Sequence, residues 1–143
     1  MADPRKTVSF TRIGACDATY KIDNSTITYD VTKAGGSAQV GLAVTLSADD
    51  TVALTADADA VLGKLIKVEA DGYCTVQEAG HLDLPAGNGA SVTRGKSIVG
   101  ALGASSAKGY IREVNTAQAA ELGKARGFIH NNATSTAIGV YLP

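Results

Sequence analysis

Short stretches in which apolar and polar residues alternate, separated by turn sequences, run through most of this chain. Between 38 and 46 every second residue is apolar: Val40, Leu42, Val44 and Leu46. A period of two places such side chains on one face of a half-buried strand. The segments 63–70 and 73–78 flank Asp71-Gly72, a dipeptide favoured in type I′ hairpin turns. This pattern predicts an all-β fold, either a small β-barrel or a β-sandwich.

The remaining segments extend this prediction along the chain. Further strands are expected at 22–31, 51–55, 81–84, 96–102, 108–114, 128–130 and 137–142. One short helix is expected over 117–124, with Thr116 as its N-cap and Gly127 just beyond its end. The chain is therefore expected to hold at most one short helix.

Residues 1–20 differ in composition from the rest and predict an extended N-terminal arm, followed by a single β domain at 21–143. Fully extended, a segment of this length spans about 65–70 Å. Two interpretations stay open: an arm that grips a partner, or a frayed terminus or first strand of the sheet. If the arm grips a partner, the expected contact residues are Arg5, Lys6, Val8, Phe10 and Arg12.

The apolar content suffices for one domain, but only for a thin core. Of the 143 residues, 32 are Val, Leu, Ile or Phe, and 24 are Ala. The large apolar residues are thus about 22% of the chain, close to the composition below which chains stop folding. Because a partner often completes a thin core, we expect the protein to form an oligomer or a bound state.

Charge and hydropathy argue against several classes of protein. The formal net charge is −1, whereas a dedicated nucleic-acid binder usually carries a clear basic excess. The sequence contains no apolar run long enough for a transmembrane helix. Its first residues lack the apolar stretch of a signal peptide, so we expect synthesis and folding in a cytoplasm.

Two features, a segment similar to a phosphate-binding loop and a pair of cysteines, suggest a functional site but lack the residue spacing that such a site needs. A phosphate-binding loop needs G-x-x-x-x-G-K-[ST], but Ala90 occupies the first glycine position ahead of Gly95-Lys96-Ser97. A turn leading into a strand is the favoured interpretation of this segment. Cys16 and Cys74 are 58 positions apart without a CxxC spacing, so we expect two reduced, partly buried thiols.

His81 and Asp83 are the best candidates for a catalytic or metal-binding pair. Their spacing of two would place both side chains on one face of a strand. Two ligands are few for a metal site, so an exposed polar face is the favoured interpretation, with His130 at a turn. A small metal-dependent enzyme built on His81 and Asp83 stays a minor hypothesis. Otherwise we expect no enzymatic activity, no cofactor and no metal.

Charged residues are distributed unevenly along the chain. The segment 48–83 has a formal charge of −6, whereas 94–126 has a formal charge of +4. The acidic loops do not match the ligand spacing of an EF-hand. The asymmetry favours complementary surfaces that meet between subunits or against a partner, with a solvated surface as the alternative.

Three segments resemble a family of small head proteins of tailed bacteriophages, the capsid decoration or cement proteins. The pattern G-x-L-x-x-V-E-x-D-G-x-x-T-V begins at Gly63 and ends at Val76. The pattern G-x-x-I-V-G follows at 95–100, and G-Y-I-R at 109–112. The likeness covers about half of the chain, from Val40 to Val114. It rests on scaffold residues and not on a catalytic signature.

The resemblance implies a non-enzymatic β subunit on the outer capsid surface of a virion, synthesised in the host bacterial cytoplasm. Its partner would be the major capsid protein of a tailed phage, and it would associate as a trimer, or alternatively a dimer. Burying surface across adjacent capsomers would tie them together against internal DNA pressure. No contact with nucleic acid or membrane is expected.

A second function stays open beside this one, a phage or bacterial surface module that recognises a glycan or a receptor. Such a module commonly presents a platform of aromatic rings. The chain has no Trp, five Tyr and two Phe, which counts against this alternative.

Overall fold

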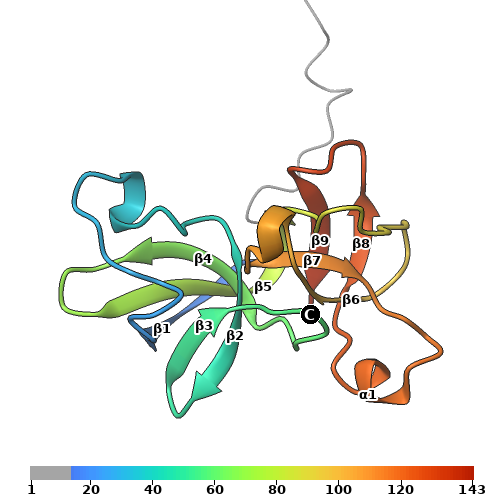
Figure 1. Ribbon diagram of the computed structural model, residues 1–143, viewed down its shortest axis with the longest axis horizontal. Coiled ribbons are helices and arrows are strands. Elements are labelled where there is room, and N and C mark those ends of the chain that lie inside the picture. Colours follow the sequence, from blue (N-terminus) through green and yellow to red (C-terminus); the bar gives the residue numbers. More distant parts are fainter. Residues whose placement is uncertain (1–13) are drawn as a thin grey trace, which may run out of the picture.

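The computed structural model describes residues 14–143, and its fold is built mostly of strands (Figure 1). Five strands form a closed barrel: β1 (Cys16–Ile22), β2 (Ala43–Ala48), β3 (Thr51–Leu54), β4 (Gly63–Val68) and β5 (Tyr73–Leu84). Their order is β1-β3-β2-β4-β5, and β1 also pairs with β5, which closes the ring. Only β1 and β3 pair in parallel in this barrel. The predicted all-β class is confirmed, with the barrel as its architecture.

The strand β5 continues beyond the barrel into a second β lobe. Its residues 80–84 pair with β9 (Ile138–Leu142), which also pairs with β8 (Phe128–Asn131). A hairpin of β6 (Ile98–Ala101) and β7 (Tyr110–Glu113) completes this lobe. The strand predicted at 81–84 is therefore the second half of β5. The strands predicted at 51–55, 96–102, 108–114 and 137–142 contain β3, β6, β7 and β9, and the one predicted at 128–130 is extended by one residue in β8.

Each lobe has its own hydrophobic core. The barrel encloses Ile22, Ile27, Val44, Val52, Leu54, Leu65, Val68, Cys74 and Val76. The second core contains Ala43, Val61, Leu82, Leu84, Ile98, Ile111, Ile129, Ile138, Val140 and Leu142. All of these side chains are aliphatic except that of Cys74, as expected from the composition.

The hairpin of β4 and β5 forms where it was predicted, but with a different turn. Gly72 has a φ of +86°, whereas Asp71 is not among the described residues with positive φ, and a type I′ turn requires both. The Gly72 N–H donates to the Glu69 carbonyl at 3.2 Å, and the Glu69 N–H donates to the Tyr73 carbonyl at 2.8 Å. The turn is thus a four-residue turn over 69–72 in which glycine alone takes the left-handed conformation.

The strand predicted over 22–31 is wrong except at Ile22, because Asp23 turns the chain immediately after β1. The Asp23 carboxylate accepts hydrogen bonds from the N–H groups of Ser25, Thr26 and Ile27 at 3.0–3.3 Å. Thr26 Oγ1 in turn accepts the N–H of Leu54 on β3 at 2.9 Å. This loop directs Ile27, which is fully buried, into the barrel core.

We expect Asp23→Ala to destabilise the protein by about 1–2 kcal/mol at pH 7, as for loss of a capping carboxylate. Burial raises the pKa of Asp23, but the hydrogen bonds from Thr26, Ile27 and Ser25 outweigh it and hold that pKa below its ordinary value. A lowered folded-state pKa stabilises the fold above the unfolded pKa, and this contribution disappears as pH falls through the folded pKa. Urea unfolding at several pH values should show the difference from wild type narrowing below about pH 4.

The control for this variant is Asp49→Ala, since the Asp49 carboxylate makes no hydrogen bond with other described residues. This control should stay within about 0.5 kcal/mol of wild type at every pH. A loss in Asp23→Ala that is the same at pH 7 and pH 3 would show that the ionised carboxylate is not what holds the loop.

The N-terminal boundary also differs from the prediction. Residues 16–20 were assigned to an extended arm, but they form most of β1, which pairs with β5 from Cys16↔Ala79 to Lys21↔Tyr73. A strand gains stability from its backbone ladder, so the few apolar residues of this segment did not indicate it. For residues 16–20, the interpretation of the segment as a first strand of the sheet is therefore the correct one. Residues 1–13 lie outside the described part of the chain.

The alternation over 38–46 corresponds to a shorter strand than predicted, since β2 begins at Ala43. Val44 is fully buried, whereas Leu46 is 54% exposed. The strand β2 pairs with β4 only at Ala43 and Val44, and beyond them it pairs with β3 alone. Leu46 thus lies on the part of β2 that pairs with β3 alone, within the β2–β3 hairpin.

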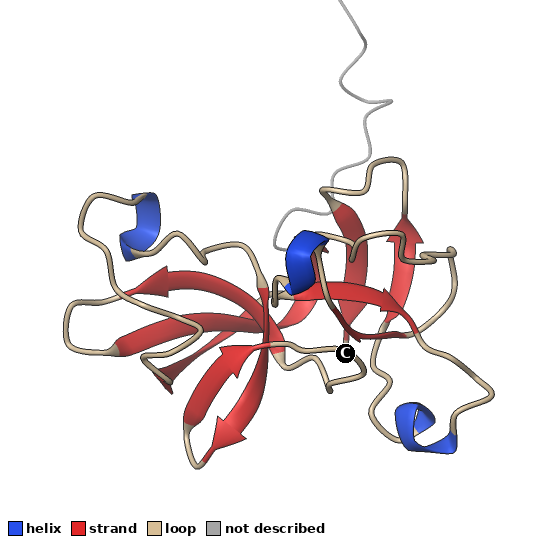
Figure 2. Ribbon diagram, in the orientation of Figure 1, coloured by secondary structure: helices blue, strands red, loops and turns tan. Residues whose placement is uncertain are grey.

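The helical content is small, as Figure 2 shows. The predicted helix over 117–124 is reduced to one turn, α1 (Ala119–Leu122), which follows Gln118 and not Thr116. The Asn115 side chain accepts the Ala117 N–H at 3.1 Å and delays the helix start. Two 3₁₀ turns, η2 (Ala34–Gly36) and η3 (Ala104–Ser106), are the other helical elements described. No helix among residues 14–143 is long and apolar enough to span a membrane.

Candidate functional site

The contact residues predicted for the arm, Arg5, Lys6, Val8, Phe10 and Arg12, lie outside the described residues. The described chain begins at Gly14, which lies beside the middle of β5. A Cβ atom built on Gly14 would be 3.6 Å from the Cα atom of Gly80. Residues 1–13 are therefore attached next to the point where β5 passes from the barrel to the second lobe.

The outer face of the β5–β9–β8 sheet carries four ring side chains, which we call the aromatic face: His81, Phe128, His130 and Tyr141. In the strand register Tyr141 pairs with His81 on one side and with Phe128 on the other. The ring centroids are 5.0 Å apart for the first pair and 5.3 Å apart for the second. The neighbours on these strands, Leu82, Ile129 and Val140, are buried in the second core.

The two histidines of the aromatic face are adjacent. Nδ1 of His81 lies 3.3 Å from Nε2 of His130, and their rings are edge-to-face. Burial lowers the pKa of His130, and His81 lowers it further, while the charge of Asp83 opposes them. His130 was predicted at a turn, but it lies on β8 because β8 extends to Asn131. Among residues 14–143 no group of three or more His, Cys, Asp or Glu side chains could hold a metal ion.

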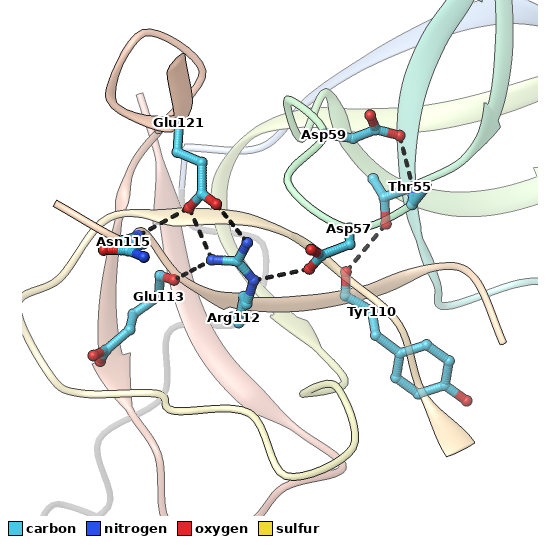
Figure 3. Close-up of polar contacts among 9 residues, drawn as sticks. Thr55, Asp57, Asp59, Tyr110, Arg112, Glu113, Asn115 and Glu121 are labelled. Atoms are coloured by element: carbon cyan, nitrogen blue, oxygen red, sulfur yellow. Dashed lines mark hydrogen bonds and ion pairs between the residues drawn. The ribbon is translucent and has the colours of Figure 1, made fainter. Parts of the chain in front are cut away.

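A second polar feature is centred on Arg112 of β7 (Figure 3). The guanidinium donates to both carboxylate oxygens of Glu121, at 2.9 and 2.7 Å, and to Oδ1 of Asp57 at 3.0 Å. Glu121 also accepts the Asn115 N–H at 2.9 Å. The hydrogen bonds from Arg112 and Asn115 lower the pKa of Glu121 to about 2.

The Arg112 contacts bear on the uneven charge distribution of the sequence. Asp57 belongs to the acidic stretch and Arg112 to the basic one, yet they form an ion pair within one chain. Some of the opposite charges that were expected to meet between subunits or against a partner thus pair within one chain, between the loop after β3 and strand β7. Contact between the remaining charges of different subunits stays a prediction.

A cleft of about 660 Å³ lies beside the Arg112 contacts. The end of β7, the loop that follows β5 and the Asp57 loop form its walls. Its polar lining includes Asp57, Asn88, Ser91, Lys96, Arg112 and Glu113. Oε2 of Glu113 is buried and has no hydrogen-bond partner among the described residues. Sequence reasoning did not identify this cleft, because it joins segments that are distant along the chain.

The phosphate-loop segment behaves as predicted, whereas the prediction for the two cysteines is confirmed only in part. The segment Gly95-Lys96-Ser97 leads into the strand β6 and not into the helix that a phosphate loop needs. Both cysteines are free thiols. Cys16 is exposed, so only Cys74 is buried, and burial raises the pKa of Cys74 to about 11.

Comparisons of the chain with protein-family models, with curated proteins and with solved structures found no match. The resemblance to capsid decoration proteins therefore rests on the sequence patterns, whose residues have structural roles here. Gly63 and Gly100, for example, stand where a Cβ atom would lie 2.0 Å and 2.3 Å from the carbonyl oxygens of Gln77 and Ala56. Both glycines allow two backbone segments to approach closely.

Proposed function

We propose that the protein is a non-catalytic binding subunit that decorates the outer surface of a tailed-phage head and stabilises contacts between capsomers. The observation that carries the proposal is the aromatic face on β5, β9 and β8, next to the attachment point of residues 1–13. Tyr and Phe are enriched at protein–protein interfaces, where they contribute much of the binding energy. The sequence resemblance supports the major capsid protein as the partner.

The arrangement of this surface supports a role in contact and not in chemistry. Phe128 is 42% exposed although it packs against Tyr141. The backbones beneath these rings belong to three paired strands, so little conformational entropy remains to be lost when a partner binds. A rigid face combined with an N-terminal arm would let one subunit contact two neighbouring capsid proteins, with the gain that bivalent attachment brings.

The test is cosedimentation of the purified protein with expanded phage heads that lack it. We expect saturable binding at a fixed ratio to the major capsid protein. Phe128→Ser should weaken the binding about tenfold or more, the effect of losing a strong interface residue. The control Tyr73→Ser removes a ring of the same 42% exposure at the start of β5, and it should change the affinity less than about twofold.

A variant lacking residues 1–13 separates the contributions of the arm and the body. Weaker binding by this variant would show that residues 1–13 contribute to capsid binding, with Arg5, Lys6, Val8, Phe10 and Arg12 as the expected contacts. Unchanged binding would show that the β body alone, residues 14–143, makes the contacts with the capsid. Failure of the wild-type protein to bind any such head would refute the proposal of capsid decoration.

The aromatic face also favours the second function, recognition of a glycan, more than the composition suggested. Rings that lie side by side on a sheet can stack on sugar faces, and Tyr141 with Phe128 forms such a pair. The same Phe128→Ser and Tyr73→Ser pair distinguishes the functions on a glycan array. Binding to immobilised glycans that Phe128→Ser abolishes, without binding to heads, would support the module that recognises a glycan.

A further inference from the structure

The two histidines of the aromatic face are 49 positions apart in the sequence and come from strands that are not neighbours. His81 lies on β5 and His130 on β8, and β9 runs between these strands. The imidazole of His130 therefore has to cross β9 to reach β5. In the sequence, Asp83 was the candidate second ligand beside His81, whereas the structure brings His130 within 3.3 Å of it.

Gly139 of β9 makes this crossing possible. A Cβ atom built on Gly139 would lie 2.6 Å from Cε1 and 3.1 Å from Nδ1 of His130. The imidazole thus occupies the space that a side chain on β9 would fill. Gly139 has no positive φ, so its backbone conformation does not require glycine. The absence of a side chain at this position instead allows the His130 ring to lie over the strand.

The facing nitrogens of the two histidines have the spacing of two ligands on one metal ion. With Zn–N bonds of about 2.0–2.1 Å, two nitrogens of a tetrahedral site are about 3.3–3.4 Å apart. Nδ1 of His81 lies 3.3 Å from Nε2 of His130, a distance that is long for a hydrogen bond. The ring centroids are 5.0 Å apart, which is less than the N–N distance plus the two ring radii. The rings are therefore inclined to each other and not in line.

We propose that His81 and His130 together bind one divalent transition-metal ion of the class that prefers imidazole: Zn²⁺, Cu²⁺ or Ni²⁺. Both histidines are only partly buried, so an ion can approach them from solvent. Residues 14–143 hold no group of three or more His, Cys, Asp or Glu side chains for a metal. The other coordination positions are thus left to water, and the ion is exchangeable and not structural. The site does not depend on capsid decoration.

The experiment is a titration of the full chain, without an affinity tag, with ZnCl₂. Calorimetry gives the affinity and stoichiometry, and NMR follows the Cε1–H signals of the histidines. The chain contains two histidines, so substitution of either one assigns both signals. We expect one Zn²⁺ per chain, with both signals shifting along the same saturation curve. Mg²⁺, which prefers oxygen ligands, should shift neither signal.

Three variants test the geometry of the site. His81→Gln and His130→Gln should each weaken Zn²⁺ binding about tenfold or more, because a single imidazole loses the gain of bidentate attachment. Gly139→Ala keeps both histidines but places a methyl group where the His130 ring lies, and it should weaken binding about tenfold as well. Gly123→Ala is the matched control, since its Cβ atom would be 3.9 Å from the nearest atom, and it should leave the affinity unchanged.

Two other side chains near this site are candidate ligands for Zn²⁺. Cys16 is an exposed thiol, and it pairs with Ala79, two residues before His81, in the β1–β5 ladder. Cys16→Ser should leave the affinity unchanged. Asp83 follows His81 by two residues on β5, and Asp83→Asn should weaken the binding less than either histidine variant does.

Several results would overturn the proposal. Equal affinity of the wild-type protein and either histidine variant would show that a single imidazole binds the ion, and so would a shift of only one histidine signal. Loss of binding in Cys16→Ser would assign the ion to the thiol, and a loss in Asp83→Asn as large as in the histidine variants would assign it to the carboxylate. Unchanged binding by a folded Gly139→Ala protein would contradict the proposed placement of the His130 ring. If Gly139→Ala does not fold, the two histidine variants decide, because their side chains are partly exposed.

Discussion

Gly63→Ala is expected to destabilise the protein by about 3–4 kcal/mol, because the new methyl group has no space beside β5. A Cβ atom on Gly63 would lie 2.0 Å from the carbonyl oxygen of Gln77 and 2.8 Å from its carbonyl carbon. Both are backbone atoms of the paired strand, so relief of the contact requires β4 and β5 to separate. Gly63 has no positive φ, so the effect comes from contact and not from backbone strain.

Urea unfolding would measure this loss as a fall in the midpoint concentration. Gly123→Ala is the matched control, because Gly123 also lacks a positive φ and its Cβ would be 3.9 Å from the nearest atom, the Ala120 carbonyl oxygen. This control should stay within about 0.5 kcal/mol of wild type. A Gly63→Ala protein within about 1 kcal/mol of wild type would show that the β4–β5 pairing is looser than the structure indicates.

Arg126→Met is expected to destabilise the protein by about 3 kcal/mol, because Arg126 holds segments of both lobes together. Its guanidinium donates to the carbonyl of Leu62, to that of Glu78 at 2.6 Å and to that of Pro143 at 2.9 Å. Its backbone pairs with Ile98 at the start of β6. Methionine would fill the space of the side chain but leave these carbonyls without their donor.

Thermal unfolding would measure the effect as a Tm about 10 °C below wild type. Lys124→Met removes a neighbouring exposed charge and should change the stability by less than about 0.5 kcal/mol. Arg126→Lys should recover less than half of the loss, since an ammonium group cannot reach several carbonyls at once. Equal Tm values for Arg126→Met and Lys124→Met would contradict a role for Arg126 in joining the lobes.

The surroundings of Arg126 show why its burial is tolerated. Burial lowers the pKa of Arg126, while the charge of Glu78 opposes this effect. The Glu78 carboxylate also accepts a hydrogen bond from the Tyr20 hydroxyl of β1. That bond, followed by burial, raises the pKa of Tyr20 to about 12. Arg126, Glu78 and Tyr20 thus form one polar group at the junction of the barrel and the second lobe.

The hairpin of β4 and β5 shows what local sequence can predict. A period of two and an Asp-Gly turn placed β4 almost at its observed bounds and predicted the start of β5, which continues beyond the predicted end at Glu78 to Leu84. The turn type was wrong because it depends on how the strands align, and Glu69 and Tyr73 close a longer turn. Residues 22–31 had the same alternation, yet Asp23 binds three backbone N–H groups and removes the segment from the sheet.

The candidate sites were harder to predict than the strands. His81 was singled out in the sequence, but its neighbours on the aromatic face come from two other strands, near the end of the chain. Their adjacency depends on the registers β5–β9 and β8–β9. In the same way, Asp57 and Arg112 are 55 positions apart and meet only because the loop after β3 packs against β7.

The amino-acid sequence by itself determined the all-β class, the position of most strands and the aliphatic nature of the core. These properties follow from side-chain periodicity and turn residues, which act over a few positions. Only the tertiary structure decided that five strands close into a barrel, that β5 serves both lobes, and that segments distant in the sequence form the cleft beside Arg112. These features arise from pairing between distant segments, whose register depends on the packing of the whole chain.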